Sequence, residues 1–355
     1  MHKISQINIK NRIISEKSPC FIIAEGGVNH NGRLDIALKM VDVAADAGAD
    51  AIKFMIFKAG QVVTESVSMA SYQKKNIGKS GSQFSLLKKL ELKDDMYRLI
   101  IERCKKRNII FILTPHGGFE SIDFFEKLKI SVFKFGSGDL TNLPVLEYAA
   151  KFNKPMILGT GMADMSEVKK AVSCIKKAGN NKIIVLHCTT NYPCASKEVN
   201  LRAMQKMQKE LGVLVGYSDH TLGLQVPIMA TTLGACVIEK HFTLDKKMRG
   251  PDHKASLDPK ELEEMVKSIR KVDTILGNSK KGPTLSELKH IPLVRKSVVA
   301  KEDIKKGNKF DFNNLAIKRP GTGLKPEFFL NIIGKISKNN IKKDTLITKK
   351  DFINV

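Results

Sequence analysis

The sequence contains no pair of cysteines spaced as C-x-x-C, although it has six cysteines in total. This absence excludes the common zinc-binding patterns, and the spacings give no disulfide framework. We therefore expect all six to be reduced thiols. Cys188 and Cys194 flank a loop that we predict to lie at a functional site, and we expect both to serve in packing.

Long apolar segments are also missing. No run approaches the roughly 18 apolar residues of a membrane span. The opening residues, MHKISQINIK, alternate in character and lack the apolar stretch of a signal peptide. We therefore expect no membrane partner and a cytoplasmic location.

A third absence concerns nucleic acid. The formal net charge of +24 would suit a polyanion, but the lysines are scattered over predicted helix faces. No helix-turn-helix, ribonucleoprotein motif or zinc finger accompanies them. We expect no nucleic-acid partner, and a positive field that can attract small anionic substrates.

What is present is a regular alternation of strand and helix patterns. Helical segments separate apolar runs at 21–25, 51–57, 109–114, 132–136, 155–159, 182–188, 213–217 and 236–241. The last helix is predicted over 258–276, with Asp258-Pro259 at its start. Eight such units over about 250 residues predict an α/β fold, a (β/α)₈ TIM barrel. A doubly wound open sheet is the alternative.

The barrel pattern divides the chain into four parts. We predict an N-terminal β-hairpin over 1–19, the barrel over 20–276, a linker over 277–292 and a small, mostly β module over 293–355. Residues 58–90 form an unusually long connection after the second strand, which would place them on the catalytic face, where they could act as a lid.

Two histidines end successive strand patterns. His220 follows the run at 213–217, and His241 closes the run at 236–241. Adjacent parallel strands deliver their C-terminal ends to the same face, so the two imidazoles could meet and bind a divalent cation. A histidine at a strand end is also often a hydrogen-bonded structural residue, and the spacing alone leaves both interpretations open.

Two lysines, Lys53 and Lys134, lie within strands that should otherwise be apolar. A buried lysine is costly unless an anion pairs with it. Together with nearby hydroxyls and glycines, the two lysines would form a site for a phosphate or a carboxylate. Alternatively, both could point outward between helices with their ammonium groups in water.

Other polar residues end the predicted strands on the same face. Glu25 and Asp139 could orient a hydroxyl-rich substrate or act as a base; a helix cap or an ion pair is the plainer role for Asp139. The remaining candidates at strand ends include Thr114, Ser137, Tyr192, Ser218 and Glu239.

Ten segments, taken together, resemble the sialic acid (N-acetylneuraminate) synthase family, and they cover nearly the whole chain in order. They are IIAEGGVNHNG (22–32), GADAIKF (48–54), FKFGSGDLTNLP (133–144), ILGTGM (157–162), LHCTTNYP (186–193), VNLRAM (199–204), GYSDHTLG (216–223), VIEKHFTLD (237–245), GPDHKASL (250–257) and KRPGTG (318–323).

The resemblance implies an enzyme that condenses phosphoenolpyruvate with an N-acylated hexose to give a nonulosonic (sialic-type) acid and phosphate. The acceptor would be N-acetylmannosamine or a 2,4-diacetamido-6-deoxy hexose. The resemblance also implies a divalent metal, Mn²⁺ or Mg²⁺, held by His220 and His241. The tail would be an antifreeze-like (SAF) domain that caps the partner's active site in a domain-swapped homodimer.

The family's site residues carry over onto matching positions of this sequence. The residues implied to act in catalysis are Glu25, His220 and His241. Those implied to surround phosphoenolpyruvate are Lys53, Thr114, Lys134, Ser137, Tyr192 and Ser218. Those implied to face the sugar are Glu25, Asp139, Asp252 and, from the SAF domain, Arg319.

Two positions depart from the family pattern. Met55 stands where the family usually has glutamine, and His116 stands where it usually has phenylalanine. Both departures lie beside the expected substrates, so they leave the identity of the sugar open. Two other functions also stay open. One is condensation of phosphoenolpyruvate with an aldose phosphate, as in the 3-deoxy-keto acid synthases, and the other is a non-catalytic binding protein that retains the barrel.

Overall fold

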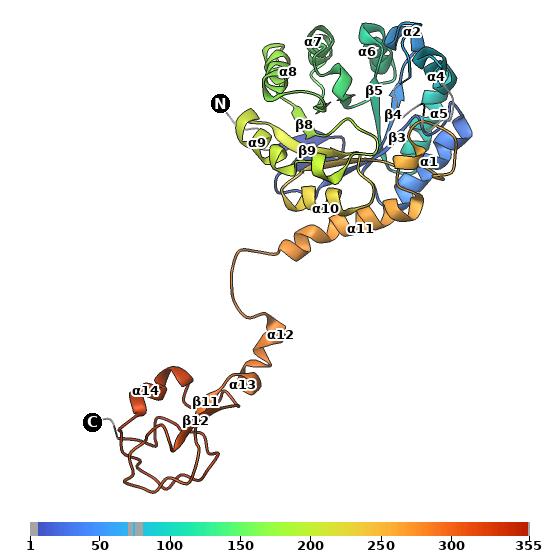
Figure 1. Ribbon diagram of the computed structural model, residues 1–355. Helices are drawn as coiled ribbons and strands as arrows, with labels where there is room; N and C mark the ends of the chain where they lie inside the picture. Colours follow the sequence, from blue (N-terminus) through green and yellow to red (C-terminus); the bar gives the residue numbers. More distant parts are fainter. Residues whose placement is uncertain (1–5, 70–73, 75–80, 354–355) are drawn as a thin grey trace. The chain divides into compact units, whose positions relative to one another are not determined.

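The computed structural model describes residues 6–69, 74 and 81–353. These residues fall into two compact units that are divided between residues 277 and 278. The first unit contains a closed barrel of eight parallel strands (Figure 1). They are β3 (Phe21–Gly27), β4 (Ala51–Ile56), β5 (Ile110–Pro115), β6 (Phe133–Phe135), β7 (Met156–Gly159), β8 (Ile183–His187), β9 (Leu214–Asp219) and β10 (Val237–His241). Because β10 also pairs with β3, the sheet closes, so the predicted barrel is confirmed and the open-sheet alternative is wrong.

Helices cover the outside of the barrel, and their apolar residues pack against the strands (Figure 1). They are α1 (Leu34–Asp46), α5 (Asp94–Lys106), α6 (Gly118–Lys127), α7 (Leu143–Ala150), α8 (Met165–Lys177), α9 (Leu201–Leu211), α10 (Gln225–Thr232) and α11 (Pro259–Leu276). The predicted start of α11 is confirmed: Asp258 caps the helix by accepting from Glu261 N, and Pro259 is its first residue. Proline suits this position because it has no N–H to leave unpaired.

The long connection after β4 is only partly described. It contains α2 (Ala59–Val62) and α4 (Gln83–Leu90), whose cap Ser82 accepts from Ser85 N. Residues 70–73 and 75–80 of the predicted loop lie outside the described residues.

A β-hairpin closes the N-terminal end of the barrel. Strands β1 (Gln6–Ile9) and β2 (Arg12–Ser15) pair antiparallel. Ile7, Ile9 and Ile14 are buried in one cluster with the apolar side chains that point into the barrel. This end of the barrel is therefore a packed hydrophobic core.

The second unit has a hydrophobic core of its own, built around β11 (Ser297–Ala300), β12 (Leu315–Lys318) and α14 (Phe329–Ile332). Two short helices precede it. The first, α12 (Leu285–Leu288), lies within the segment predicted as a linker, and the second, α13 (Ile291–Val294), begins in that segment and ends two residues beyond it. All six cysteines of the chain are free thiols, as predicted. Across the described ranges, no helix combines the length and apolar character needed to cross a bilayer.

Candidate active site

The side chains that point into the barrel change from apolar to polar along strands such as β10 and β3. In β10, Val237 belongs to the apolar interior, while Glu239 and His241 follow at steps of two residues. The same step leads from Ile23 to Glu25 in β3. Side chains alternate across a strand with a period of two, so these polar groups gather at the C-terminal end of the barrel, where the active sites of TIM barrels lie.

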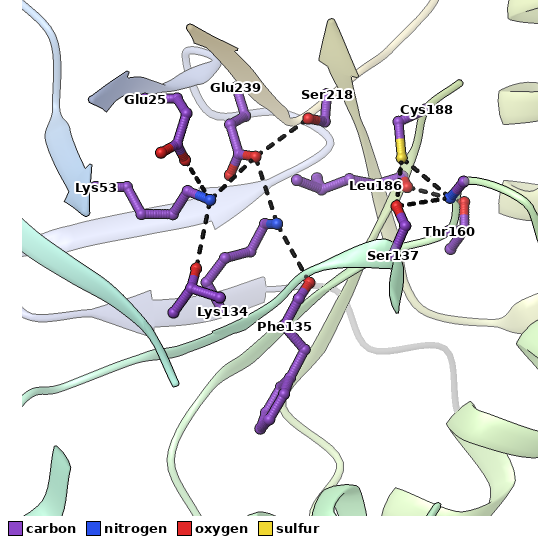
Figure 2. A network of polar contacts seen from close by, with 12 residues as sticks. Glu25, Lys53, Lys134, Phe135, Ser137, Thr160, Leu186, Cys188, Ser218 and Glu239 are labelled. Carbon is purple, nitrogen blue, oxygen red and sulfur yellow. Dashed lines mark hydrogen bonds and ion pairs between the residues drawn. The ribbon is translucent and has the colours of Figure 1, made fainter. Parts of the chain in front are cut away.

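A network of buried charges occupies this end of the barrel (Figure 2). The Lys53 ammonium contacts Glu25 Oε2 and lies 3.4 Å from Glu239 Oε1, which is also 3.4 Å from Lys134 Nζ. Ser218 donates to the same oxygen over 3.1 Å. Both lysines thus point into the barrel, so the outward alternative is wrong. We call Glu25, Lys53, Lys134 and Glu239 the inner network.

The inner network carries no net charge when all four groups are ionised, but its hydrogen bonds are incomplete. Glu25 Oε1 and Glu239 Oε2 are buried and have no hydrogen-bond partner in the described part of the chain. Buried carboxylate oxygens normally accept hydrogen bonds, and unsatisfied ones are costly. These two oxygens can therefore accept hydrogen bonds from a bound substrate or from water.

The environment of the inner network shifts the pKa values of its members. Burial lowers the pKa of Lys53 to about 7, which Glu239 opposes and Lys134 reinforces. Burial alone would raise the pKa of Glu239, but the charges of Lys134 and Lys53 outweigh it and lower that pKa to about 2. Glu239 therefore stays a carboxylate, while Lys53 can change its protonation state near neutral pH.

Hydroxyl, thiol and backbone groups line the barrel opposite Glu25. Ser137 Oγ accepts from Gly161 N over 2.9 Å and lies 3.2 Å from Cys188 Sγ (Figure 2). Cys188, which we expected to serve in packing, therefore also lines the site. Lys53 donates to Thr114 Oγ1 over 3.4 Å. These small polar groups are suited to holding the oxygens of an anion.

His220 and His241 do meet at the barrel opening, with ring centroids 5.7 Å apart. His220 Nδ1 lies 2.6 Å from Thr189 O, so we assign the proton of the neutral ring to Nδ1 and the free lone pair to Nε2. The ring of Tyr192 lies 4.1 Å from that of His220. Burial lowers the pKa of both histidines, most strongly for His241, which also feels the charge of His220.

This donor set fits a divalent cation. His241 Nδ1 is buried without a hydrogen-bond partner among the described atoms, and His220 Nε2 has a lone pair to offer. Neutral imidazoles are common metal ligands, and a backbone carbonyl that holds the second ring nitrogen is the usual support. Within residues 6–69, 74 and 81–353, no three His, Cys, Asp or Glu side chains converge on one point. The protein would thus supply two ligands.

Gly27 shapes the strand end that carries Glu25. It has a φ of +51° and follows a register shift between β3 and β4. A Cβ atom there would lie 3.1 Å from Glu25 Oε1 and 3.3 Å from His241 Cε1. Glycine therefore permits the turn and leaves space beside both side chains.

His116 and Asp139 form a second pair at the rim. His116 Nδ1 lies 2.9 Å from Asp139 Oδ2, and both side chains are half-buried. The backbone N–H of His116 donates to Ile56 O over 2.8 Å, which extends the pairing of β5 with β4 by one residue. Met55 lies in register with Thr114 on these neighbouring strands. The two departures from the family pattern are thus close in space.

Two adjoining cavities open at this face. The polar cavity, of about 150 Å³, is lined by Lys53, Lys134, Ser137, Gly138, Cys188, Thr190, Ser218, His220 and Glu239, among others. The apolar cavity, of about 230 Å³, is lined by Val28, Phe57, Val62, Leu86, Leu87, Leu90 and Asp252, among others. The residues that line both cavities are Met55, His116, Tyr192 and His241.

Asp252 is the acid of the apolar cavity. It is buried, and burial raises its pKa to about 6. The loop that carries it is fixed to the loop after β3, because Asn29 donates to Phe242 O over 2.8 Å and to Ser256 Oγ over 3.0 Å. A carboxyl that can hold its proton near neutral pH can donate a hydrogen bond as well as accept one.

The opposite face of the same strands carries a separate ion pair. The Lys240 ammonium contacts Asp219 Oδ2 and donates to Thr221 O over 2.6 Å. Asp219 in turn accepts from Thr221 N and Thr221 Oγ1 over 3.1 and 3.0 Å. We call Asp219 and Lys240 the outer pair. It fixes the turn that contains His220.

The structure brings most of the predicted site residues together at the C-terminal end of the barrel. Arg319 lies in the second unit, directly before a cis proline. Among the described residues, the predicted site residues Glu25, Thr114 and Asp139 line neither cavity. Glu25 and Thr114 contact Lys53, whereas Asp139 contacts His116. Glu239 joins the inner network but was given no role by sequence reasoning. Its spacing of two residues from His241 was the available signal.

Comparison with known protein families gives two matches. Residues 40–281 match the NeuB family, and residues 295–353 match the SAF domain. The first match spans most of the barrel, including the inner network residues Lys53, Lys134 and Glu239.

Individual relatives are similar over almost their whole length. The chain is 47% identical to the N,N'-diacetyllegionaminic acid synthase of Campylobacter jejuni, over 92% of this chain and 98% of that protein. It is 44% identical to the Legionella pneumophila protein of the same name, over 92% and 93%. Among solved structures, the N-acetylneuraminic acid synthetase of Leptospira borgpetersenii superposes with a TM-score of 0.72 at 36% identity, covering 81% of this chain and 95% of that one.

Proposed function

Because this chain belongs to the NeuB family, we propose that it condenses phosphoenolpyruvate with an N-acylated hexose to give a nonulosonic acid and phosphate. The observation that carries the proposal is the pair of adjoining cavities, one charged and one apolar, that share a wall containing His241. An anionic donor and an uncharged acceptor would each find a complementary site, with their reacting carbons at the shared wall.

The polar cavity is the donor site. Phosphoenolpyruvate has a phosphate and a carboxylate, and Lys53 and Lys134 offer two ammonium groups for them. Ser137, Ser218 and Thr114 supply hydroxyl donors beside these lysines. When the anion takes over a contact of Lys53, Glu25 loses its contact with that ammonium group and both of its oxygens can accept from a bound molecule.

Glu25 is the residue that would move a proton. During the reaction C3 of phosphoenolpyruvate bonds to the aldehyde carbon of the acceptor, water adds at C2, and the C2–O bond to phosphate breaks. Glu25 Oε1 is buried beside the His241 ring and is free to accept the proton of that water. This role requires Glu25 to be ionised before water adds.

His220 and His241 would hold a divalent cation, Mn²⁺ or Mg²⁺. When bound there, the cation would act as a Lewis acid that polarises the aldehyde of the acceptor. Thr189 O keeps the proton of His220 on Nδ1, which leaves Nε2 for the metal. Their lowered pKa values keep both rings neutral, as metal ligation requires.

The apolar cavity favours a 2,4-diacetamido-6-deoxy hexose over N-acetylmannosamine. The first sugar carries three methyl groups, two in its acetamido groups and one at C6, whereas the second carries one methyl group. Val28, Phe57, Leu86 and Leu90 offer apolar contacts for such groups. Two relatives named for a diacetylated product support this choice.

The SAF domain would complete the site from a second copy of the chain, in a domain-swapped homodimer. Arg319 would then contact the acyl-amino group of the sugar. Light scattering on the purified protein should give twice the chain mass, and Arg319→Ala should raise the KM of the acceptor. A monomer with full activity would contradict this part of the proposal.

The central test is phosphate release from phosphoenolpyruvate in the presence of Mn²⁺ and a panel of acceptors. The panel contains a 2,4-diacetamido-6-deoxy hexose, N-acetylmannosamine and an aldose phosphate. We expect the highest kcat/KM with the diacetamido sugar, and loss of turnover in His220→Ala and His241→Ala even after chelation and metal add-back. Release only with the aldose phosphate would favour a 3-deoxy-keto acid synthase, and no release with any acceptor would favour a binding protein.

A further inference from the structure

His116 lies in the wall between the two cavities and has a carboxylate close to its ring. His116 lines both cavities, and its Nδ1 lies 2.9 Å from Asp139 Oδ2. The contact has the distance of an ion pair without the angles of a hydrogen bond, and Asp139 Oδ2 is buried without a hydrogen-bond partner among the described residues. The negative charge of Asp139 beside Nδ1 nevertheless favours the proton of the neutral ring at that nitrogen. In the neutral ring Nε2 therefore has the free lone pair.

The surroundings of His116 fix both the ring and its backbone. A Cβ atom on Gly136 would lie 3.3 Å from His116 Cε1 and 3.4 Å from Nε2, so the edge of the ring that carries Nε2 packs over this glycine. The backbone N–H is held by Ile56 O. Asp139 is itself fixed, because its N–H donates to Gly136 O over 3.0 Å. The pair is thus a pre-formed recognition element.

Beside Met55, the imidazole of His116 is the group that can form a hydrogen bond with a substrate. Met55 and His116 line both cavities from the neighbouring strands β4 and β5. Met55 offers only apolar contact, and Asp139 lines neither cavity among the residues described. A polar substituent of an acceptor that reaches this stretch of wall would meet His116 first.

We propose that His116 is a specificity-determining residue that accepts a hydrogen bond from an amide N–H or a hydroxyl of the acceptor sugar, and that Asp139 is its positioning residue. The inference rests on the proposed function of the site, and it names the residue that determines specificity for the acceptor sugar. The family resemblance implied that Asp139 contacts the sugar directly. Here Asp139 instead positions His116. Met55 then supplies the apolar contact beside this hydrogen bond.

The test compares His116→Phe and His116→Gln with the wild-type protein, using phosphate release with each substrate varied in turn. Phenylalanine keeps the ring but removes Nε2, whereas the glutamine amide can reach the same place. We expect the KM of the diacetamido acceptor to rise about tenfold in His116→Phe, as loss of one substrate hydrogen bond predicts. The KM of phosphoenolpyruvate should stay within twofold, and His116→Gln should recover most of the acceptor affinity.

A second variant tests the positioning role. Asp139→Ala leaves the imidazole in place but frees its ring, so we expect a smaller rise in the acceptor KM, about threefold, with kcat unchanged. His290→Phe, at an exposed histidine of the second unit, is the matched control and should change neither KM. Thermal unfolding of each variant identifies any loss of folded protein.

The possible outcomes separate this inference from the proposed function. If wild-type protein turns over and His116→Phe has an unchanged acceptor KM, the inference is wrong and the proposed function stands. If His116→Phe lowers kcat with every acceptor and leaves KM unchanged, His116 acts in the chemical step and the specificity role is also wrong. If wild-type protein releases no phosphate with any acceptor, the proposed function fails and the inference fails with it.

Discussion

Glu239 and Lys240 are consecutive residues of β10, yet they belong to two buried charge clusters of different kinds. Lys240, on the outer face, contacts Asp219 and Thr221 O, and Asp219 receives both the N–H and the hydroxyl of Thr221. Glu239, on the inner face, shares one oxygen among Lys53, Lys134 and Ser218 and leaves the other without a partner in the described chain.

The difference between these clusters separates stability from chemistry. The outer pair has its hydrogen bonds satisfied, as expected of a buried ion pair that maintains a fold. The inner network is unsatisfied and has strongly shifted pKa values, which is typical of a site prepared for a ligand. One strand supports both because its successive side chains point to opposite faces.

The largest effect on activity is expected when both partners of the Glu25–Lys53 ion pair are replaced together. Glu25→Gln with Lys53→Met should lower kcat/KM at least about 10³-fold, because it removes charges that face the donor and the attacking water. The free energy of unfolding should change by no more than about 1 kcal/mol, because neither partner remains as an isolated charge. Phosphate release measures the first effect. Far-UV circular dichroism in urea measures the second, since the chain has no tryptophan.

The single variant Lys53→Met is the control for this experiment. It should destabilise the barrel more than the double variant does, because Glu25 then keeps a buried charge without its cation. A double variant that lost several kcal/mol of stability would show that the inner network maintains the fold. The inner network and the outer pair would then have the same role.

The outer pair should show the reverse behaviour. Lys240→Met leaves Asp219 buried without its cation, which should lower the free energy of unfolding by about 3 kcal/mol. Lys267→Met removes an exposed lysine from its contact with Glu263 and should cost less than about 0.5 kcal/mol. Urea unfolding of the two variants makes the comparison. Equal losses would mean that the outer pair is no more important than a surface ion pair.

The pH dependence of donor binding should report on Lys53. Above pH 7 the ammonium of the free enzyme progressively loses its proton, so the KM of phosphoenolpyruvate should rise by up to about tenfold per pH unit. Lys53→Arg keeps its charge over this range and should abolish the slope, even if it raises the KM throughout. A flat KM between pH 7 and 9 in the wild-type protein would contradict the assignment.

The free energy of unfolding should also depend on pH through Lys53, and the direction of this dependence follows from its pKa. The pKa of Lys53 is about 7 in the folded protein against an ordinary value of 10.5, so the unfolded chain binds more protons between these values. Lys53 therefore contributes stability that increases from pH 7 towards 10.5. Lys53→Met should remove this contribution from the measured pH profile of unfolding.

The smallest effects should come from single hydroxyl groups on either side of the turn after β9. Thr221→Val removes a donor to Asp219 and should cost about 1 kcal/mol of stability while leaving kcat/KM within twofold. Ser218→Ala removes a donor to Glu239 and should lower kcat/KM about tenfold while changing stability less. If the two variants changed stability and kcat/KM by similar amounts, the inner and outer faces of the strands would not have separate roles.

The barrel could be predicted because its signals are local. Each strand appears as a near-continuous apolar run, and a capping motif such as Asp258-Pro259 marks the start of a helix. The pairing of β10 with β3 follows once eight such units are counted, because closure pairs the last strand with the first. These features depend on periodicity and on residue type, which the sequence shows directly.

The polar contacts were harder to predict because they depend on which way side chains point. Lys53 and Lys134 had two open orientations, and only the register of the closed sheet decides between them. Glu239 received no role for the same reason, although it is two residues from His241. The contact of His116 with Asp139 joins two loops 23 residues apart, and no spacing rule predicts such a pair.

The hairpin at the N-terminal end of the barrel has a practical consequence. Ile7, Ile9 and Ile14 close the N-terminal end of the barrel, opposite the end with the polar site residues. A tether joined to the chain before the hairpin would therefore attach the barrel at the end that lacks the site. Protein fixed to a bead or a sensor chip in this way would present its cavities to the solution. Surface-coupled binding measurements with small sugars then become a direct route to the acceptor.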